Sequence, residues 1–253
     1  MATTATANLD EGRHPRMRIG PAIAVYVWQY PLRLVHWGIV ISILFLSATG
    51  YYIHSPYVAP PRYPFFMAAV RFVHESFGMA FIAFFLIRIY LFFAGDRWVR
   101  WRALVPLRKE QWKEMIEVAK FYAFVRPRPV SKVGHNALAA LSYIGIYMLI
   151  FIEIVTGLVM FDWVRHSSIL HPLVGWIPRM ISIQNVRLIH YCLMFVFIAF
   201  GILHVHLCLV VSSAEKRGLL DSIFTGYKIV PVNELDEDDR AAIEASKGHR
   251  VHK

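Results

Sequence analysis

The sequence predicts an all-α integral membrane protein: a bundle of four transmembrane helices, with both termini cytoplasmic and an amphipathic surface helix between helices two and three. Three observations predict this fold class. Of the 253 residues, 57% are hydrophobic and 17% charged, which is little charge for the surface of a soluble domain. Four apolar stretches are each long enough to cross a hydrocarbon core of about 30 Å. The basic residues concentrate in particular segments outside these stretches.

The N-terminal residues contain no apolar run before Pro21, so we expect a cytoplasmic tail over residues 1–30 and not a cleaved signal peptide. The four-helix unit is expected over residues 31–213, followed by a cytoplasmic C-terminal tail over residues 214–253. The predicted spans are approximately residues 32–53, 65–94, 137–161 and 186–212.

The charge of the connecting segments predicts the topology. Residues 97–132, between the second and third spans, hold ten Lys or Arg, whereas residues 162–185, between the third and fourth, hold two Arg. By the positive-inside rule, the basic connection and both tails are cytoplasmic. The net charge of +10 is therefore explained by membrane topology, and we expect a lipid bilayer and no nucleic acid as partner.

Within the basic connection, an amphipathic helix is predicted. Trp112, Met115, Ile116 and Ala119 are spaced three or four residues apart along a single helical stripe, with charged residues on the rest of the surface. Such a helix either lies on the inner membrane surface or binds a partner.

The two cysteines exclude several kinds of site. Cys192 and Cys208 lie on one predicted helix, which separates them by more than about 20 Å, so they cannot form a disulfide with each other. Iron-sulfur and structural zinc sites draw several thiolates from short spacings. Neither cysteine begins a CxxCH motif, so any haem is held non-covalently.

Five of the twelve histidines lie inside the spans, and four of them can be paired by depth: His36, His74, His190 and His204. The alternating directions of the helices place His74 and His190 near the outer surface and His36 and His204 near the inner one. Two imidazoles from facing helices can coordinate one iron axially. The pattern predicts two b-type haems at two depths, although a single histidine in a span more often only packs.

His206 is a competing candidate for the inner site. It lies two residues beyond His204 and about 200° around the helix, so both cannot point at one iron. We choose His204 because it shares a helix face with His190, fourteen residues earlier.

Three glycines lie near these histidines: Gly50, Gly78 and Gly201. Each can let a flat macrocycle approach the backbone, and each can equally serve close helix packing.

Two arginines are candidate partners for the cofactor. Arg71 stands one turn before His74 and can pair with the propionates of the outer haem. Arg88 faces the inner site, where it either pairs with a propionate or a bound quinone or extends to the inner headgroups.

The motifs around these residues resemble the b-type cytochrome subunit of membrane-bound [NiFe] hydrogenases, a family related to the cytochrome subunits of formate dehydrogenase and thiosulfate reductase. The resemblance rests on five segments: RLVHW from Arg33, RFVHESFG from Arg71, GHNALAALSY from Gly134, RLIHYCLMFVFIAFGILHVHL from Arg187, and DSIFTGYK near the C-terminus.

The resemblance implies two haems b ligated at His36, His74, His190 and His204, in the bacterial inner membrane. It also implies a periplasmic electron donor, the hydrogenase small subunit with its iron-sulfur clusters and C-terminal transmembrane helix, and through it the large [NiFe] subunit. The expected acceptor is a membrane quinone, which His135 and Asn136 are expected to help bind. Asn136 can also simply cap the third helix.

Two other functions fit the same features. One is the cytochrome subunit of a formate dehydrogenase or thiosulfate reductase. The other, from a different class, is a histidine-based transporter or membrane anchor, because intramembrane His and Glu also occur in proton and metal pathways.

Overall fold

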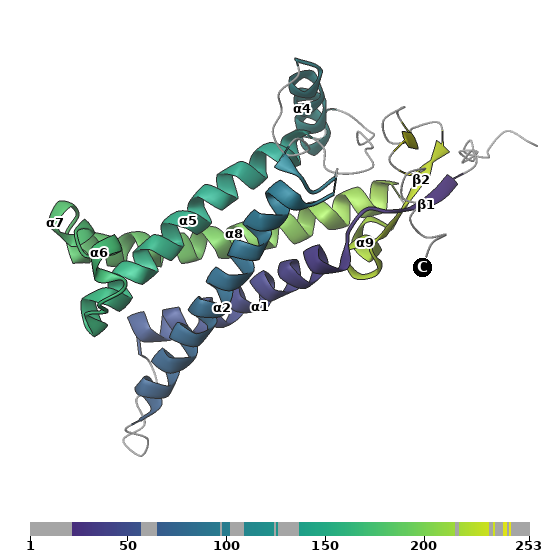
Figure 1. The fold of residues 1–253 in the computed structure, drawn as a ribbon. Helices are drawn as coiled ribbons and strands as arrows, with labels where there is room; N and C mark the ends of the chain where they lie inside the picture. Colours follow the sequence, from purple (N-terminus) through teal and green to yellow (C-terminus); the bar gives the residue numbers. More distant parts are fainter. Residues whose placement is uncertain are drawn as a thin grey trace, which may run out of the picture.

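The computed structural model describes residues 22–56, 65–96, 98–101, 109–123, 125, 137–215, 218–232, 235, 240–241 and 243. Four long helices dominate these ranges, with short helices at one end and a two-stranded sheet at the other (Figure 1). Following the predicted topology, we call the end that carries α6 and α7 the outer end, and the end with α4, α9 and the sheet the inner end.

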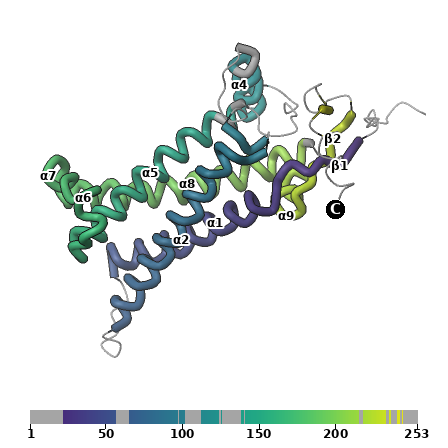
Figure 2. Tube along the Cα trace, viewed as in Figure 1, coloured from purple at the N-terminus to yellow at the C-terminus, as the bar shows by residue number. Residues whose placement is uncertain are grey.

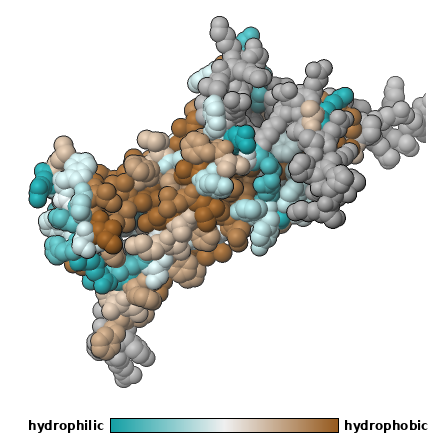
Figure 3. All heavy atoms as spheres, viewed as in Figure 1, coloured by the Kyte–Doolittle hydropathy of each residue, from teal (hydrophilic) through white to brown (hydrophobic). Residues whose placement is uncertain are grey.

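The long helices confirm the four predicted spans to within a few residues. They are α1 (Tyr30–His54), α2 (Phe66–Ala94), α5 (Ala137–Arg165) and α8 (Ile183–Glu215). Each is long and apolar enough to cross a membrane. Figure 3 shows the consequence on one face of the molecule, where a broad hydrophobic surface over the helices gives way to hydrophilic residues at both ends. The chain is therefore an all-α membrane bundle.

The bundle consists of two helix hairpins. Helix α1 packs along α2, and α5 packs along α8, while α1–α8 and α2–α5 contacts hold the two hairpins together. The tube trace follows the same arrangement (Figure 2). Side chains from α2, α5 and α8 form the core at mid-height: Phe81, Phe85, Ile146, Ile150 and Phe197.

At the outer end, an ion pair and two short helices close the bundle. Glu75 of α2 lies 2.8 Å from Arg165 of α5, which ties the hairpins together at the surface. The connection from α5 to α8 forms α6 (His171–Val174) and α7 (Ile177–Met180), each with Pro in its first turn. The buried carboxylate of Asp162 anchors this connection, because it accepts hydrogen bonds from the Ser167 amide and the His171 ring.

At the inner end, α4 (Lys109–Tyr122) confirms the helix predicted between the second and third spans. It packs beside α5. Trp112 and Ile116 of its apolar stripe are exposed, whereas Val118 is buried. The stripe is thus available to lipid or to a partner.

The inner end also contains structure where the sequence suggested only tails. Strand β1 (Ala22–Tyr26) pairs antiparallel with β2 (Tyr227–Pro231), in the register Ala22 opposite Pro231. Helix α9 (Leu219–Thr225) precedes β2. The expectation of tails over residues 1–30 and 214–253 therefore misses a small unit that joins the two ends of the described chain. A pairing between segments so far apart in sequence leaves no local signal.

Gly226 makes the turn from α9 into β2 possible. Its φ is +90°, and a Cβ there would lie 2.4 Å from the Tyr26 ring and 2.7 Å from the Trp28 carbonyl oxygen. The Gly226 carbonyl in turn accepts hydrogen bonds from the amides of Val27 and Trp28. Only glycine fits this close approach.

Candidate functional site

The outer histidine pair joins the two hairpins across the bundle. His74 of α2 and His190 of α8 face each other with ring centroids 6.4 Å apart and ring planes inclined by 67°. Within the described residues α2 and α8 do not pack extensively on each other, so the two imidazoles approach each other from helices that belong to different hairpins.

The inner pair has the same separation. His36 of α1 and His204 of α8 have ring centroids 6.4 Å apart and planes inclined by 49°. It is His204, and not its neighbour His206, whose ring faces His36. Both pairs therefore use α8, at two depths that are about 21 Å apart along that helix.

A centroid separation near 6.4 Å is the distance expected for two imidazoles on opposite sides of one metal ion. A metal–imidazole nitrogen bond of about 2 Å puts the two centroids roughly 6 Å apart. In the described part of the chain, no group of three or more His, Cys, Asp or Glu residues is placed to hold a metal. Each pair thus suits an ion that brings its own equatorial ligands, as haem iron does.

Both outer histidines are hydrogen-bonded to a threonine on the partner helix of their own hairpin. The Thr49 hydroxyl oxygen lies 2.8 Å from His74 Nδ1, and the Thr156 hydroxyl oxygen lies 3.0 Å from His190 Nδ1. A carboxylate oxygen of Glu153 is 3.4 Å from the same His190 nitrogen. Such contacts fix the orientation and the tautomer of an imidazole.

A glycine follows each of these threonines and lies against the same ring. A Cβ on Gly50 would lie 3.1 Å from His74 Cε1, and a Cβ on Gly157 would lie 3.3 Å from His190 Cε1. The absence of a side chain at both positions lets the imidazoles pack close to the backbone of α1 and α5. Gly50, one of the three glycines singled out in the sequence, thus contacts the ring of His74.

The inner histidines have different surroundings. His36 packs edge-on against Trp37, and its buried Nδ1 has no hydrogen-bond partner within the described residues. The His204 ring is stacked on Phe200, and its Nε2 lies 3.9 Å from the Cys208 sulfur. Among the described residues, no threonine is hydrogen-bonded to either histidine of the inner pair.

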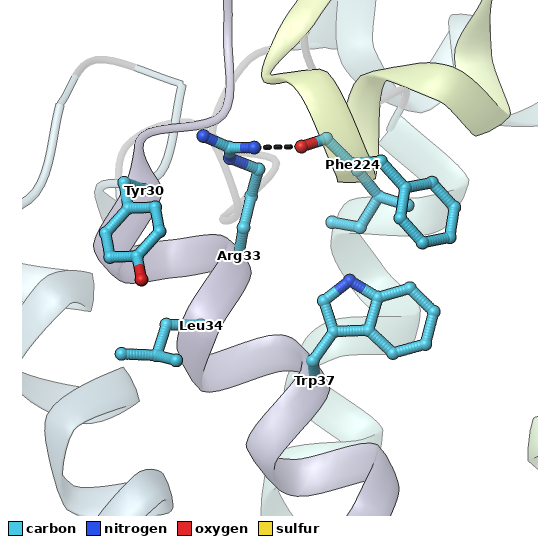
Figure 4. A pocket seen from close by; sticks show the side chains of 6 residues that line it. Tyr30, Arg33, Leu34, Trp37 and Phe224 are labelled. Atoms are coloured by element: carbon cyan, nitrogen blue, oxygen red, sulfur yellow. Dashed lines mark hydrogen bonds between the residues drawn. The ribbon is translucent and has the colours of Figure 1, made fainter.

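Helix α9 covers the α1 segment that carries His36. The guanidinium of Arg33 donates a hydrogen bond to the Phe224 carbonyl, and Trp37 packs on the Phe224 ring with centroids 5.0 Å apart. These residues line an open groove of about 230 Å³ between α1 and α9 (Figure 4). The groove is also lined by Tyr30, Leu34 and Ile223.

The other predicted glycines lie beside open space. A Cβ on Gly78 of α2 or on Gly201 of α8 would meet no atom within 4 Å. Gly145 of α5 has the same property. Gly78 and Gly201 therefore do not serve tight helix packing within the described chain, and room remains beside each of them.

The two predicted arginines differ in their exposure. Arg71 is exposed at the outer end of α2. Arg88 is only 6% exposed, its Nη1 has no hydrogen-bond partner among the described residues, and its guanidinium carbon lies 5.5 Å from the centre of the Tyr147 ring. The Tyr147 hydroxyl is also buried, beside this guanidinium. A buried cation with an unused donor is suited to an anionic ligand.

His135 and Asn136, the predicted quinone contacts, lie outside the described residues. Sequence reasoning also missed three residues of the outer site: Thr49, Thr156 and Gly157. The signal that could have found them is the dipeptide Thr-Gly inside a predicted span, which occurs at residues 49–50 and at 156–157, each time toward the outer end of the span. The third Thr-Gly of the sequence, at residues 225–226, lies outside the spans.

Comparison with known proteins places most of the chain in one group. Residues 27–226 match the family model described as prokaryotic cytochrome b561. A probable Ni/Fe-hydrogenase B-type cytochrome subunit from Azotobacter vinelandii is 31% identical over 214 residues, covering 81% of this chain and 89% of the relative. A protein of the same name from Cupriavidus necator is 32% identical over 212 residues, covering 81% of this chain and 87% of the relative.

A probable Ni/Fe-hydrogenase 1 B-type cytochrome subunit from Escherichia coli is 27% identical over 229 residues, covering 87% of this chain and 97% of the relative. The segment that matches the family model contains all four paired histidines and the α9 segment.

Proposed function

The chain belongs to the prokaryotic cytochrome b561 family, and from this membership we propose that it is the dihaem b subunit of an uptake [NiFe] hydrogenase. In this proposal the subunit receives electrons on the periplasmic side from the iron-sulfur small subunit, which is linked to the large [NiFe] subunit. It passes them to the quinone pool of the bacterial inner membrane. The observation that carries the proposal is the pair of equal imidazole separations, 6.4 Å at each of two depths.

Each histidine pair would hold one haem b. His74 and His190 would supply the axial ligands of the outer haem, and His36 and His204 those of the inner haem. When bound, the haems would supply one-electron chemistry at iron. The protein's own task is to hold the imidazoles and to exclude water.

The open space beside Gly78 and Gly201 supports this assignment. Gly78 lies one turn after His74, and Gly201 lies one turn before His204, so each glycine would border the macrocycle held by its neighbouring histidine. A side chain at either position would occupy that space.

The arginines would bind the haem propionates. Arg88 is buried near the inner end of α2, and its Nη1 has no hydrogen-bond partner among the described residues, so we assign it to an anionic group of the inner cofactor. Arg71, one turn before His74 at the outer end, is assigned to the propionates of the outer haem. Ionic hydrogen bonds of this kind are roughly twice as strong as neutral ones.

Phenylalanine and aliphatic side chains fill the bundle between the two pairs. Phe197 of α8 lies midway between His190 and His204 in sequence, and it packs in the core with Phe81 and Phe85 of α2. This apolar core would keep water out of the region between the haems, which suits electron transfer without proton leakage. The quinone would be reduced at the inner end, where His135 and Asn136 are expected.

The test has a spectroscopic and a biochemical part. The reduced-minus-oxidised visible spectrum of the purified chain should show b-type bands with two haems per chain. A content near one, or no b-type band, would contradict the dihaem proposal. Membranes containing the chain and its partner subunits should reduce quinone with dihydrogen. Reduction with formate in place of dihydrogen would assign the chain to the related enzyme.

A further inference from the structure

Thr49 and Thr156 occupy equivalent places in the two hairpins. Each lies on the first helix of its hairpin, α1 or α5, each is followed by glycine, and each contacts the histidine of the second helix through Nδ1. The glycine of each dipeptide touches the Cε1 atom of the same ring. The arrangement therefore occurs twice, in segments more than a hundred residues apart.

The direction of the hydrogen bonds follows from the helix backbone. The Thr49 hydroxyl lies 2.6 Å from the Phe45 carbonyl oxygen, and the Thr156 hydroxyl lies 2.9 Å from the Ile152 carbonyl oxygen. A carbonyl oxygen can only accept, so each hydroxyl donates its single proton to the backbone. The threonine oxygen then accepts from the imidazole, which requires a hydrogen on Nδ1.

This tautomer has a direct consequence for the ring. A neutral imidazole carries one N–H group, so a hydrogen on Nδ1 leaves the lone pair on Nε2. In both outer histidines Nε2 is thus the available ligand atom. The Glu153 oxygen at 3.4 Å from His190 Nδ1 is a second acceptor on that same side of the ring. The inner pair lacks this support, because His36 Nδ1 has no partner within the described residues.

We infer that Thr49 and Thr156 are positioning residues for the outer haem, each holding its histidine with Nε2 directed at the iron. The inference rests on the proposed function. A coordinated imidazole that donates from Nδ1 is a more basic ligand, and a more basic ligand favours oxidised iron. The two threonines therefore lower the reduction potential of the outer haem, and they leave the inner haem unaffected.

The experiment compares Thr49→Val and Thr156→Val, which keep the shape but remove the hydroxyl, with Thr49→Ser and Thr156→Ser, which keep it. Redox titration of the full chain, followed by visible spectra and by the low-temperature EPR signals of the ferric haems, reports each haem separately. Ser42→Ala is the matched control, because the one hydrogen bond of the buried Ser42 hydroxyl within the described chain goes to the Gly38 carbonyl of its own helix.

Each Val variant should raise the potential of the outer haem and shift its EPR signal, or release that haem while the inner one is retained. The two Ser variants and Ser42→Ala should have the same potential and EPR signal of the outer haem as the wild type. This inference would be overturned if both Val variants bind two haems and the reduction potential and EPR signal of the outer haem are unchanged. That outcome would leave the proposed function standing. A wild-type chain without two haems would overturn it together with the proposed function.

Discussion

Arg88 lies over the ring of Tyr147, with 5.5 Å between its guanidinium carbon and the ring centre, and it is buried in the bundle without a partner for Nη1 within the described residues. A cation in this position is costly in a membrane protein unless an anion joins it. In the proposed function that anion belongs to the inner cofactor.

Replacing Arg88 with Gln should weaken the binding of the inner haem. Loss of a hydrogen bond to a charged group costs about 1.5–3 kcal/mol, which corresponds to roughly 10- to 100-fold in affinity. Haem content after detergent washing measures the effect. Arg165→Gln is the control, because Arg165 is an exposed arginine paired with Glu75 at the outer end. Equal retention of both haems in the Arg88 variant would count against this role.

Leucine at Gly78 or Gly201 should remove haem without unfolding the bundle. The Cβ of the new side chain meets no protein atom within 4 Å, so the side chain can extend into the space assigned to the macrocycle. Gly78→Leu should release the outer haem and Gly201→Leu the inner one. Gly145→Leu is the control, since Gly145 is equally open but lies on α5, which carries no paired histidine. Full haem content in both test variants would place the macrocycles elsewhere.

Alanine at Gly50 or Gly157 should disturb the outer haem only. The added methyl group would press on the His74 ring at 3.1 Å or on the His190 ring at 3.3 Å, so each ring must shift by a few tenths of an ångström. We expect an altered EPR signal of the outer ferric haem, larger for Gly50→Ala than for Gly157→Ala. An unchanged signal, or a change in the inner haem, would contradict the contact between these glycines and the outer ligands.

Gly226→Ala should loosen the inner end. The left-handed backbone costs about 1–3 kcal/mol for a residue with a side chain, and the methyl group would also collide with Tyr26 and with the Trp28 carbonyl. Limited proteolysis should cut the β1 and β2 segments faster in this variant. Gly218→Ala has a similar positive φ, but its nearest contact is the Asp221 side chain at 3.4 Å. Equal rates of cleavage in Gly226→Ala and Gly218→Ala would show that the close approach of Gly226 to Tyr26 and Trp28 does not stabilise the inner end.

The sequence was sufficient to predict where the four spans lie and which histidines lie at the same depth. A transmembrane helix is recognisable from its length and hydropathy, because lipid demands both over one continuous segment. The depth of each histidine then follows from the direction of its helix, which explains why His74 and His190, and likewise His36 and His204, could be paired before the fold was known.

Two features could not be predicted from hydropathy and helix direction. They are the threonine hydrogen bonds to the outer histidines and the pairing of β1 with β2 at the inner end. The contact of Thr49 with His74 depends on how α1 and α2 are rotated against each other, and hydropathy carries almost no information on rotation in a helix that is apolar all round. The pairing of β1 with β2 depends on two short segments at opposite ends of the chain. Both features need the assembled bundle.

The pairing of the histidines is tested most directly by the haem content and spectra of five single variants. His74→Ala and His190→Ala should each lose the same haem and retain the other, and His36→Ala and His204→Ala should each lose the haem that the first two variants retain. His206→Ala should keep both. Loss of the outer haem on His204→Ala, or loss of the inner haem on His206→Ala with His204→Ala unaffected, would contradict the account.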